Sequence, residues 1–407
     1  MTVFLLATLD TKGPETQLLR ERLQALGIQV CLVDVGCLGK PTVAADISRE
    51  EVFAAAGTTR HELVVANDRG AAVTAAAHGA AQIVKNAHHR NPVQGVLALG
   101  GSAGTTIGTA AMRVLPLGIP KLMVSTLASG QVRPYVADKD ILMLNSVVDL
   151  AGINRISRQV LTNAAAAMAG MVQQQTSFTT RDRPLVAATM FGVTTPCVER
   201  ARAVLEDAGY EVLVFHATGN GGQAMESLIE EGLLLGVLDL TTTELADELV
   251  GGILSAGPNR LTAAARHGVP QVISVGATDM GNFGPPETIP AEFSGRTFYH
   301  HNPTVTLMRT TISENQCVGT DIARKVSDAK GPVVILLPLQ GVSAIDAEGQ
   351  PFEDLMARQA LFATIKEHAA GVPVIELDHH INDELFAVAA AEHLLAMIQS
   401  EQLDQTD

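Results

Sequence analysis

A cluster of glycine and hydroxyl residues follows a short apolar run at positions 95–99. Glycines permit tight turns and close backbone approach, and the amides at the start of a following helix point toward any anion placed there. The cluster lacks the lysine of a Walker A loop and the spacing of a GxGxxG turn, so a plain strand-to-helix turn with hydroxyl caps is the alternative. We predict that it binds a phosphate group through Gly100, Gly101, Ser102, Gly104, Thr105 and Thr106.

Polar residues at the expected ends of neighbouring strands support the phosphate interpretation. Asp10, Thr11 and Lys12 supply a carboxylate, a hydroxyl and a cation, although a solvated loop would explain them as well. Asp34 ends the next apolar run, where doubly wound folds often bind a ribose; capping a turn is its alternative role. A second hydroxyl-rich loop would contribute Ser125, Thr126, Ser129 and Gly130.

The second half of the chain carries a different set of titratable groups at strand ends and loop starts. If these groups converge, they provide a general acid or base and an arginine that can bind a carboxylate. The candidate catalytic residues are His216, Asp239, Glu244, His301, Arg309 and His380. Asp346 is a further candidate ligand, with an ordinary turn residue as the alternative.

Simpler structural roles explain part of this second set. We predict that Thr243 caps the helix that follows it, with Asp247 reaching back from the first turn. Residues 216–222 open another helix, whose amides could receive an anion. The histidine pairs at 300–301 and 379–380 are adjacent rather than one helical turn apart, so their spacing does not predict a metal site.

The elements that position these residues occur twice in the chain. Residues 3–34 and 184–216 each comprise an apolar strand, a polar loop, an amphipathic helix that ends at a glycine, and a second strand. The correspondence continues downstream, because 95–101 matches 236–242 and 117–125 matches 267–275.

The duplication predicts the fold and the domain organisation. Alternating strands and helices of this kind form parallel sheets with crossover helices. We predict an α/β protein with two tandem, doubly wound, Rossmann-like domains at residues 1–178 and 184–402, joined near 176–184. Ligands of such sheets bind at the carboxyl ends of the strands, so the polar loops of each domain should meet at one site.

Composition limits the class of protein and its partners. The 407 residues are 47% hydrophobic and only 17% charged, which is typical of a well-buried α/β protein. A net charge of −15 without a basic stripe argues against nucleic acid or an anionic membrane as a partner. Four scattered cysteines and the lack of any apolar run of about 18 residues lead us to expect a reduced, cytoplasmic chain.

Longer motifs spread over nearly the whole chain resemble a known family. The sequence is similar to the Tm-one-like ATP-binding family in TLDTKG, GGSAGT, LPLGIPKLMVSTLASG, ATMFGVTTPCVERAR and ELDHHIND. The resemblance implies that ATP binds the first domain through the GGSAGT loop, with contributions from the loops at Lys12 and Ser125–Gly130. It also implies at least a homodimer, and Mg²⁺ could accompany the nucleotide. Ala103 departs from the glycine expected at that position.

These patterns support three hypotheses about function. The first is an ATP-dependent enzyme that acts on a small anionic metabolite held between the two domains. The second is a non-catalytic, nucleotide-binding regulatory or interaction protein, similar to the plant member of the family that inhibits viral RNA replication. The third is a metal-dependent lyase or hydrolase that uses the second domain.

Overall fold

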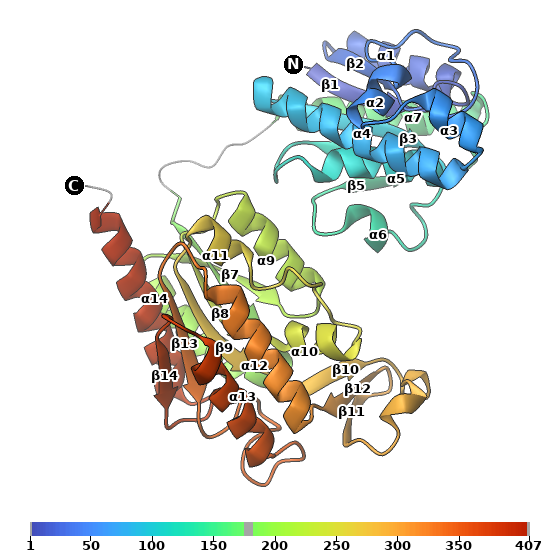
Figure 1. Ribbon diagram of the computed structural model, residues 1–407. Coiled ribbons are helices and arrows are strands. Elements are labelled where there is room, and N and C mark those ends of the chain that lie inside the picture. Colours follow the sequence, from blue (N-terminus) through green and yellow to red (C-terminus); the bar gives the residue numbers. More distant parts are fainter. Residues whose placement is uncertain (1, 175–181, 405–407) are drawn as a thin grey trace. The chain divides into compact units, whose positions relative to one another are not determined.

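The computed structural model describes residues 2–174 and 182–404. The chain divides into two compact units, Met1–Phe178 and Thr179–Asp407, and each unit has its own parallel sheet flanked by helices (Figure 1). Most of the predicted join at 176–184 lies outside the described residues.

The N-terminal unit is built on a five-stranded parallel sheet in the order β2-β1-β3-β4-β5. The central strands β3 and β4 are buried along their whole length, as expected for parallel strands covered on both faces. The order changes direction between β1 and β3, whose carboxyl ends therefore form the switch point where such folds bind ligands. The strands are β1 (Thr2–Ala7), β2 (Gln29–Asp34), β3 (Gly95–Gly100), β4 (Lys121–Ser125) and β5 (Leu142–Asn145).

Helices of this unit pack on both faces of the sheet. They are α1 (Gly13–Ala25), α2 (Arg49–Ala55), α3 (Arg60–Ala66), α4 (Arg69–Arg90), α5 (Ser102–Arg113), α6 (Arg133–Val136) and α7 (Arg155–Gln173). Leu19 of α1 and Met168 of α7 belong to the apolar layer on one face. Phe53 of α2, Ala76 of α4 and Ile107 of α5 belong to the layer on the other. The starts of α4 and α5 thus belong to the same face, beside the switch point.

The C-terminal unit repeats this topology with one additional strand. Its six-stranded parallel sheet has the order β14-β13-β9-β8-β6-β7. Read from β7 to β13, this is the strand order of the N-terminal unit, so the predicted fold class of two tandem α/β domains is confirmed. The strands are β6 (Leu185–Met190), β7 (Glu211–His216), β8 (Gly236–Thr241), β9 (Gln271–Gly276), β13 (Val333–Pro338) and β14 (Val374–Leu377).

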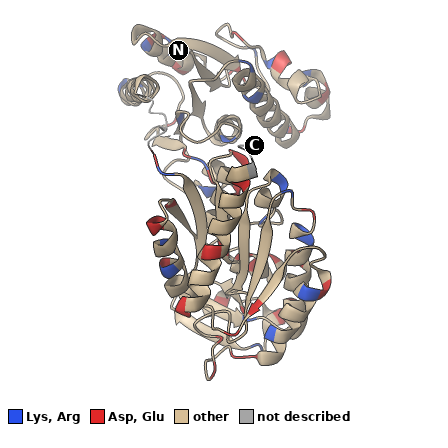
Figure 2. Cartoon of the chain, turned by 90° about the vertical axis from the view of Figure 1, so that its left-hand side faces the viewer, with Lys and Arg blue, Asp and Glu red and all other residues tan. Residues whose placement is uncertain are grey.

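The helices of the C-terminal unit follow the same crossover pattern. They are α8 (Thr195–Asp207), α9 (Asn220–Glu230), α10 (Thr243–Val250), α11 (Ala263–His267), α12 (Ile312–Val326), α13 (Leu355–His368) and α14 (Glu384–Asp404), with short 3₁₀ turns η1 (Gly192–Thr194), η2 (Pro286–Thr288) and η3 (Ala291–Phe293). Residues of both charges occur along the chain, as the colours in Figure 2 show.

A small antiparallel sheet in the C-terminal unit was not predicted. Its strands β10 (Met280–Phe283), β12 (Val305–Arg309) and β11 (Phe298–Asn302) lie in that order. The last three residues of β11 are all exposed, so this strand shows no alternation of buried and exposed positions. The sequence therefore lacked the period-two pattern that indicates a half-buried strand.

Candidate functional site

A pocket of about 260 Å³ lies at the switch point of the N-terminal unit. It is formed by the loops after β1, β2 and β3 together with the first turns of α4 and α5. Its lining residues are Thr8, Asp10, Thr11, Lys12, Cys37, Leu38, Arg69, Val73, Gly101, Ser102, Ala103 and Gly104. The pocket thus contains part of the predicted phosphate cluster and the predicted residues of the first loop.

The start of α5 opens into this pocket. Gly101 occupies the N-cap position and no side chain caps the helix, so the first amides, those of Ser102, Ala103 and Gly104, have no partner within it. A Cβ added to Gly100 would lie 2.8 Å from the Cα of Gly104, so the strand-to-helix turn requires glycine. These amides and the dipole of a 12-residue helix favour an anion.

Two cationic side chains line the same pocket. Lys12 is the N-cap residue of α1, and its ammonium donates a hydrogen bond to the backbone carbonyl of Leu150. Arg69 is exposed at the first position of α4, and it has no ion-pair partner among the described residues. Arg69 was not among the residues predicted from the sequence to bind phosphate. The residue before it, Asp68, could have indicated its position. Asp68 caps α4 by accepting a hydrogen bond from the Ala71 amide, and this places Arg69 at the start of the helix.

The hydroxyl residues divide between the pocket and its support. Thr8 and Thr11 line the pocket, with their hydroxyl oxygens 2.8 Å apart. Thr105 and Ser125 are buried and hydrogen-bonded to each other at 2.7 Å, so they connect α5 to the end of β4 instead. Five other residues predicted to bind phosphate do not line the pocket: Gly100, Thr106, Thr126, Ser129 and Gly130.

The two carboxylates predicted for this site hold its backbone in place. Asp10 Oδ2 accepts hydrogen bonds from the amides of Leu38 and Gly39 at 3.1 and 2.9 Å, which fixes one wall of the pocket. Asp34 is only 2% exposed and does not line the pocket. Its Oδ2 accepts from Arg49 Nε at 2.7 Å. The structure therefore places Asp34 in a buried ion pair, not at a position where it could contact a ribose.

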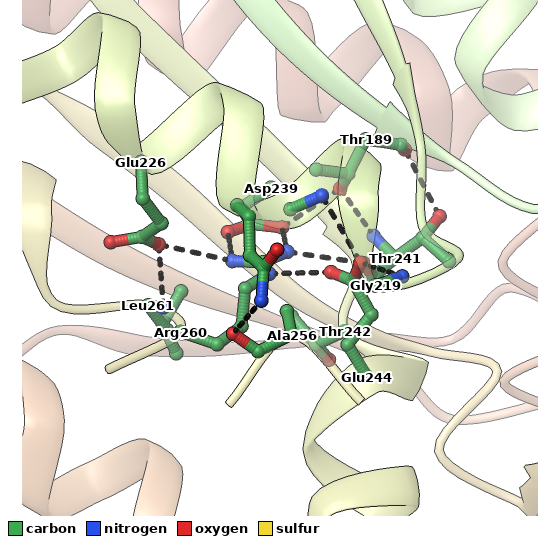
Figure 3. Close-up of polar contacts among 12 residues, drawn as sticks. Thr189, Gly219, Glu226, Asp239, Thr241, Thr242, Glu244, Ala256, Arg260 and Leu261 are labelled. Carbon is green, nitrogen blue, oxygen red and sulfur yellow. Dashed lines mark hydrogen bonds and ion pairs between the residues drawn. The ribbon is translucent and has the colours of Figure 1, made fainter. Parts of the chain in front are cut away.

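A second polar centre lies at the carboxyl ends of the strands in the C-terminal unit, around Arg260 (Figure 3). Arg260 is 1% exposed, and its two terminal nitrogens donate hydrogen bonds to the two carboxylate oxygens of Asp239, at 2.5 and 2.6 Å. Its Nε donates to Glu244 Oε2 at 2.6 Å. The two acids predicted to be catalytic are thus brought together, but both are bound to a buried arginine that no spacing indicated.

The carboxylate of Glu244 also occupies the helix start that was predicted to receive an anion. Its Oε1 accepts hydrogen bonds from the amides of Gly219 and Gly222, at 2.7 and 3.1 Å, at the beginning of α9. A Cβ added to Gly222 would lie 2.2 Å from Glu244 Oε2, so this position requires glycine. The anion at this helix is an internal side chain.

Glu226 completes the network from α9. Its carboxylate accepts from the amides of Leu261, Thr262 and Ala263 at 2.6 to 3.2 Å, which caps α11, and it lies 3.5 Å from Arg260. Burial raises the pKa of Glu226, while the Arg260 guanidinium acts in the opposite direction. Three carboxylates therefore share one buried guanidinium.

A third polar cluster joins the loops after β9 and β13. Arg309 and Arg358 contact the buried carboxylate of Asp346, at 3.3 and 3.0 Å. Asp279 accepts from the Ser343 hydroxyl at 2.8 Å, and burial followed by the Asp346 charge raises its pKa to about 7. Asp346, predicted as a candidate ligand or a turn residue, is thus the buried partner of two arginines.

The three predicted catalytic histidines occupy different surroundings. His216 is exposed at the end of β7, with its ring edge-on to Phe191 at 5.6 Å between centroids. His301 is exposed on β11. His380 Nδ1 accepts from the Asn382 amide at 3.1 Å, so its Nε2 carries the hydrogen and donates to the Ser343 carbonyl at 2.9 Å. Both ring nitrogens of His380 are therefore engaged.

Comparison with known proteins places the chain in a family. Residues 1–177 and 183–398 match the N-terminal and C-terminal domains of the uncharacterised protein family UPF0261. The chain belongs to the UPF0261 family. A UPF0261 protein of Clostridium tetani is 49% identical over 399 residues, covering 98% of this chain and 99% of the relative.

Plant relatives and solved structures extend the comparison. The tomato ToMV resistance protein Tm-1(GCR237) is 40% identical over 97% of this UPF0261 chain, which spans 55% of the tomato protein. The predicted resemblance to Tm-1-like proteins is therefore confirmed. A putative UDP-N-acetylglucosamine 2-epimerase from Listeria monocytogenes covers 100% of the chain at 10% identity with a TM-score of 0.24, and this likeness does not bear on function.

The predicted cap of α10 in this UPF0261 protein was wrong. The helix begins at Thr243, so Thr242 is the N-cap residue, and its hydroxyl donates to the Ser274 carbonyl at 3.0 Å. Asp247 instead accepts from the amide and the side-chain nitrogen of Asn282, at 2.9 and 2.6 Å. Burial raises the pKa of Asp247 to about 7. Tertiary partners outcompete the local capping bonds here.

Among the residues that the structure describes, none of the helices is long and apolar enough to span a bilayer. Within residues 2–174 and 182–404, no three side chains of the His, Cys, Asp and Glu types form a group that could hold a metal ion.

Proposed function

We propose that this UPF0261 protein binds ATP through its N-terminal unit, with the phosphates at the start of α5. The observation that carries the proposal is the uncapped helix start opening into a pocket that Lys12 and Arg69 also line. Two cations and a helix N-terminus at one pocket favour a multiply charged anion such as a triphosphate. The resemblance to Tm-one-like ATP-binding proteins supports a nucleotide as that anion.

The size of the pocket suits the phosphates rather than the whole nucleotide. Pockets that enclose an entire ligand occupy about 300–1,000 Å³, whereas this one has a volume of about 260 Å³. We expect the base and ribose to lie toward the opening, where Leu38 and Val73 provide apolar contacts.

The lining also fits a magnesium ion bound together with the phosphates. Mg²⁺ usually keeps several waters and takes one or two carboxylates along with phosphate oxygens. Asp10 is the carboxylate that lines the pocket, and one of its oxygens, Oδ1, has no hydrogen-bond partner among the described residues. Asp10 would hold the ion, directly or through water, while the ion offsets phosphate charge.

A binding or regulatory role is better supported than catalysis. Asp239, Glu244 and Arg309 are buried and have internal ionic partners, so they are not available to act on a substrate. His380 uses both ring nitrogens, which leaves His216 and His301 as the exposed candidates for proton transfer. The geometry of the described residues thus favours a protein that responds to ATP over one that consumes it.

Calorimetric titration of the full chain with ATP, with and without Mg²⁺, tests the binding proposal. Ser102→Asp is the informative variant because its carboxylate would repel phosphate, whereas an acid in the first turn of α5 favours the helix itself. We expect the wild type and the control Ser102→Ala to bind, and Ser102→Asp to bind at least tenfold more weakly. Equal affinity of all three proteins, or no binding to the wild type at millimolar ATP, would reject the proposal.

The same samples distinguish binding from catalysis. ADP release is measured with the protein saturated with ATP and Mg²⁺, alone and with a panel of small carboxylate and phosphate metabolites. We expect ATP to raise the unfolding temperature while remaining intact. Turnover that depends on one metabolite, and that is lost in His216→Ala, would instead favour an ATP-dependent enzyme.

A further inference from the structure

The segment that precedes α4, residues 57–68, is weakly attached to the N-terminal unit. None of the seven residues of α3 is buried, and Val64 and Val65 are 47% and 70% exposed. Leu63 alone among them packs partly against the apolar layer. The preceding helix α2, of the same length, buries Val52 and Phe53 fully. A helix with so few buried contacts opens at a low cost in free energy.

Residues with left-handed backbone conformations lie at both ends of this segment. Gly57 has a φ of +76° and has no neighbouring atom within 4 Å of its Cβ direction. Asn67 has a φ of +52° and ends α3, directly before the cap residue of α4. Backbone changes at these two positions would move α3 without disturbing the core helices on either side.

The segment borders the phosphate pocket. The guanidinium of Arg60, the first residue of α3, donates to the carbonyl of Leu38, which lines the pocket. The Arg60 charge also acts on the pocket-lining thiol of Cys37 and lowers its pKa, against the larger effects of burial and of Asp10. Arg69, which lines the pocket, lies two residues beyond Asn67.

Arg60 has hydrogen-bonding capacity that its present partner does not use. Its Nε is buried and has no acceptor among the described residues, and the Leu38 carbonyl carries no formal charge. A phosphate oxygen at the pocket would be a stronger acceptor for this guanidinium than a neutral carbonyl. An anion bound at α5 would therefore attract Arg69, which lines the pocket, and Arg60, whose partner Leu38 lines it.

We infer that residues 57–68 form a lid on the phosphate pocket, and that phosphates bound at α5 draw the lid closed through Arg60. This inference rests on the proposed function, because it requires a phosphate ligand in the pocket. Closure would shield the phosphates from water and slow release of the ligand. Arg60 would bind the phosphates directly and so couple the charge of the ligand to the conformation of the segment.

Hydrogen exchange of the full chain, followed by mass spectrometry, tests the lid. Exchange of residues 57–69 is compared without ligand, with ATP and Mg²⁺, and with inorganic tripolyphosphate, using β9 as an internal reference. We expect both ligands to slow exchange in the lid at least fivefold and to leave β9 unchanged. Slowing by ATP but not by tripolyphosphate would overturn closure by the phosphates.

Two variants separate the lid from the proposed function. Arg60→Ala should weaken ATP binding about tenfold, raise the dissociation rate and abolish the protection of residues 57–69, whereas Arg22→Ala, at an exposed arginine of α1, should change neither. If the wild type binds ATP with unchanged exchange in the lid, or if Arg60→Ala retains full protection, the lid is rejected and the binding proposal stands. A wild type that binds neither ligand overturns both.

Discussion

Arg260 and Asp239 form a two-bond ion pair in which neither side chain is more than 1% exposed. Buried charges of this kind contribute little net stability when paired, but removal of one partner leaves the others uncompensated. Without Arg260, the carboxylates of Asp239, Glu244 and Glu226 would repel one another with no cation to offset their charges.

Arg260→Ala should therefore destabilise the C-terminal unit strongly. We expect a loss of about 3–5 kcal/mol in the free energy of unfolding, because three carboxylates lose their shared guanidinium. Urea unfolding of the full chain measures the change. The control is Arg266→Ala, whose partner Glu230 is half exposed; a loss of at most about 1 kcal/mol is expected for it. Similar effects of the two variants would contradict the buried network.

Gly100→Ala should disrupt the turn that presents the α5 amides. Its methyl group would lie 2.8 Å from the Cα of Gly104, so the strand and the helix must separate. We expect a destabilisation of about 1–3 kcal/mol and a clear loss of ATP affinity. Gly130→Ala is the matched control, since its Cβ would meet the Leu127 carbonyl at an ordinary 3.6 Å. Wild-type stability and affinity for Gly100→Ala would refute the role of this glycine.

The contribution of Asp247 to stability should fall as pH rises from about 4 to about 7. Burial raises the pKa of Asp247 from 3.8 to about 7. Between those values the folded chain retains a proton that the unfolded chain has released, so stability is greatest below the lower value. Asp279, whose pKa is also raised to about 7, adds to the same slope.

Between about pH 4 and pH 7, the free energy of unfolding of Asp247→Asn should fall by a few kcal/mol less than that of the wild type. Part of the fall should remain, because Asp279 still titrates. The introduced amide can donate to Asn282 Oδ1, a buried oxygen without a partner among the described residues, if the Asn282 amide turns over. Urea midpoints at pH 5, 6, 7 and 8 provide the measurement. An unchanged slope in the variant would show that Asp247 ionises normally in the folded chain.

Thiol labelling should report on whether ATP binds at the pocket beside α5. Cys317 is exposed and should react first with a maleimide, whereas Cys197 is buried, with a pKa raised to about 12, and should react only on unfolding. Cys37 lines the pocket and burial raises its pKa, so it should react slowly. Saturating ATP should slow it further while Cys317 is unaffected, as measured by peptide mass spectrometry. An unchanged Cys37 rate would place the ligand elsewhere.

The sequence predicted the architecture because the strands and helices of a parallel sheet have recognisable local sequence patterns. Each buried strand is a short apolar run, and the crossover helices α1 and α8 are each followed by a glycine with a positive φ value, Gly27 and Gly209. The repeated pattern predicted two sheets, and both have the matching strand order. The position of the glycine-rich turn at the end of β3 was predictable for the same reason.

The sequence by itself determined which polar residues follow the strands, whereas only the tertiary structure decided which of them remain available to a ligand. Asp34 and Asp239 end up paired with Arg49 and Arg260, which lie 15 and 21 residues further along the chain in other elements. Such pairs depend on how helices and loops pack against the sheet, and the spacing of residues along the chain does not predict that packing. Arg69 is an example of the opposite case, a residue that was not predicted but lines the pocket. Packing of α4 beside α5 brings it there. Strand ends therefore indicate where a site can form, and long-range packing determines its members.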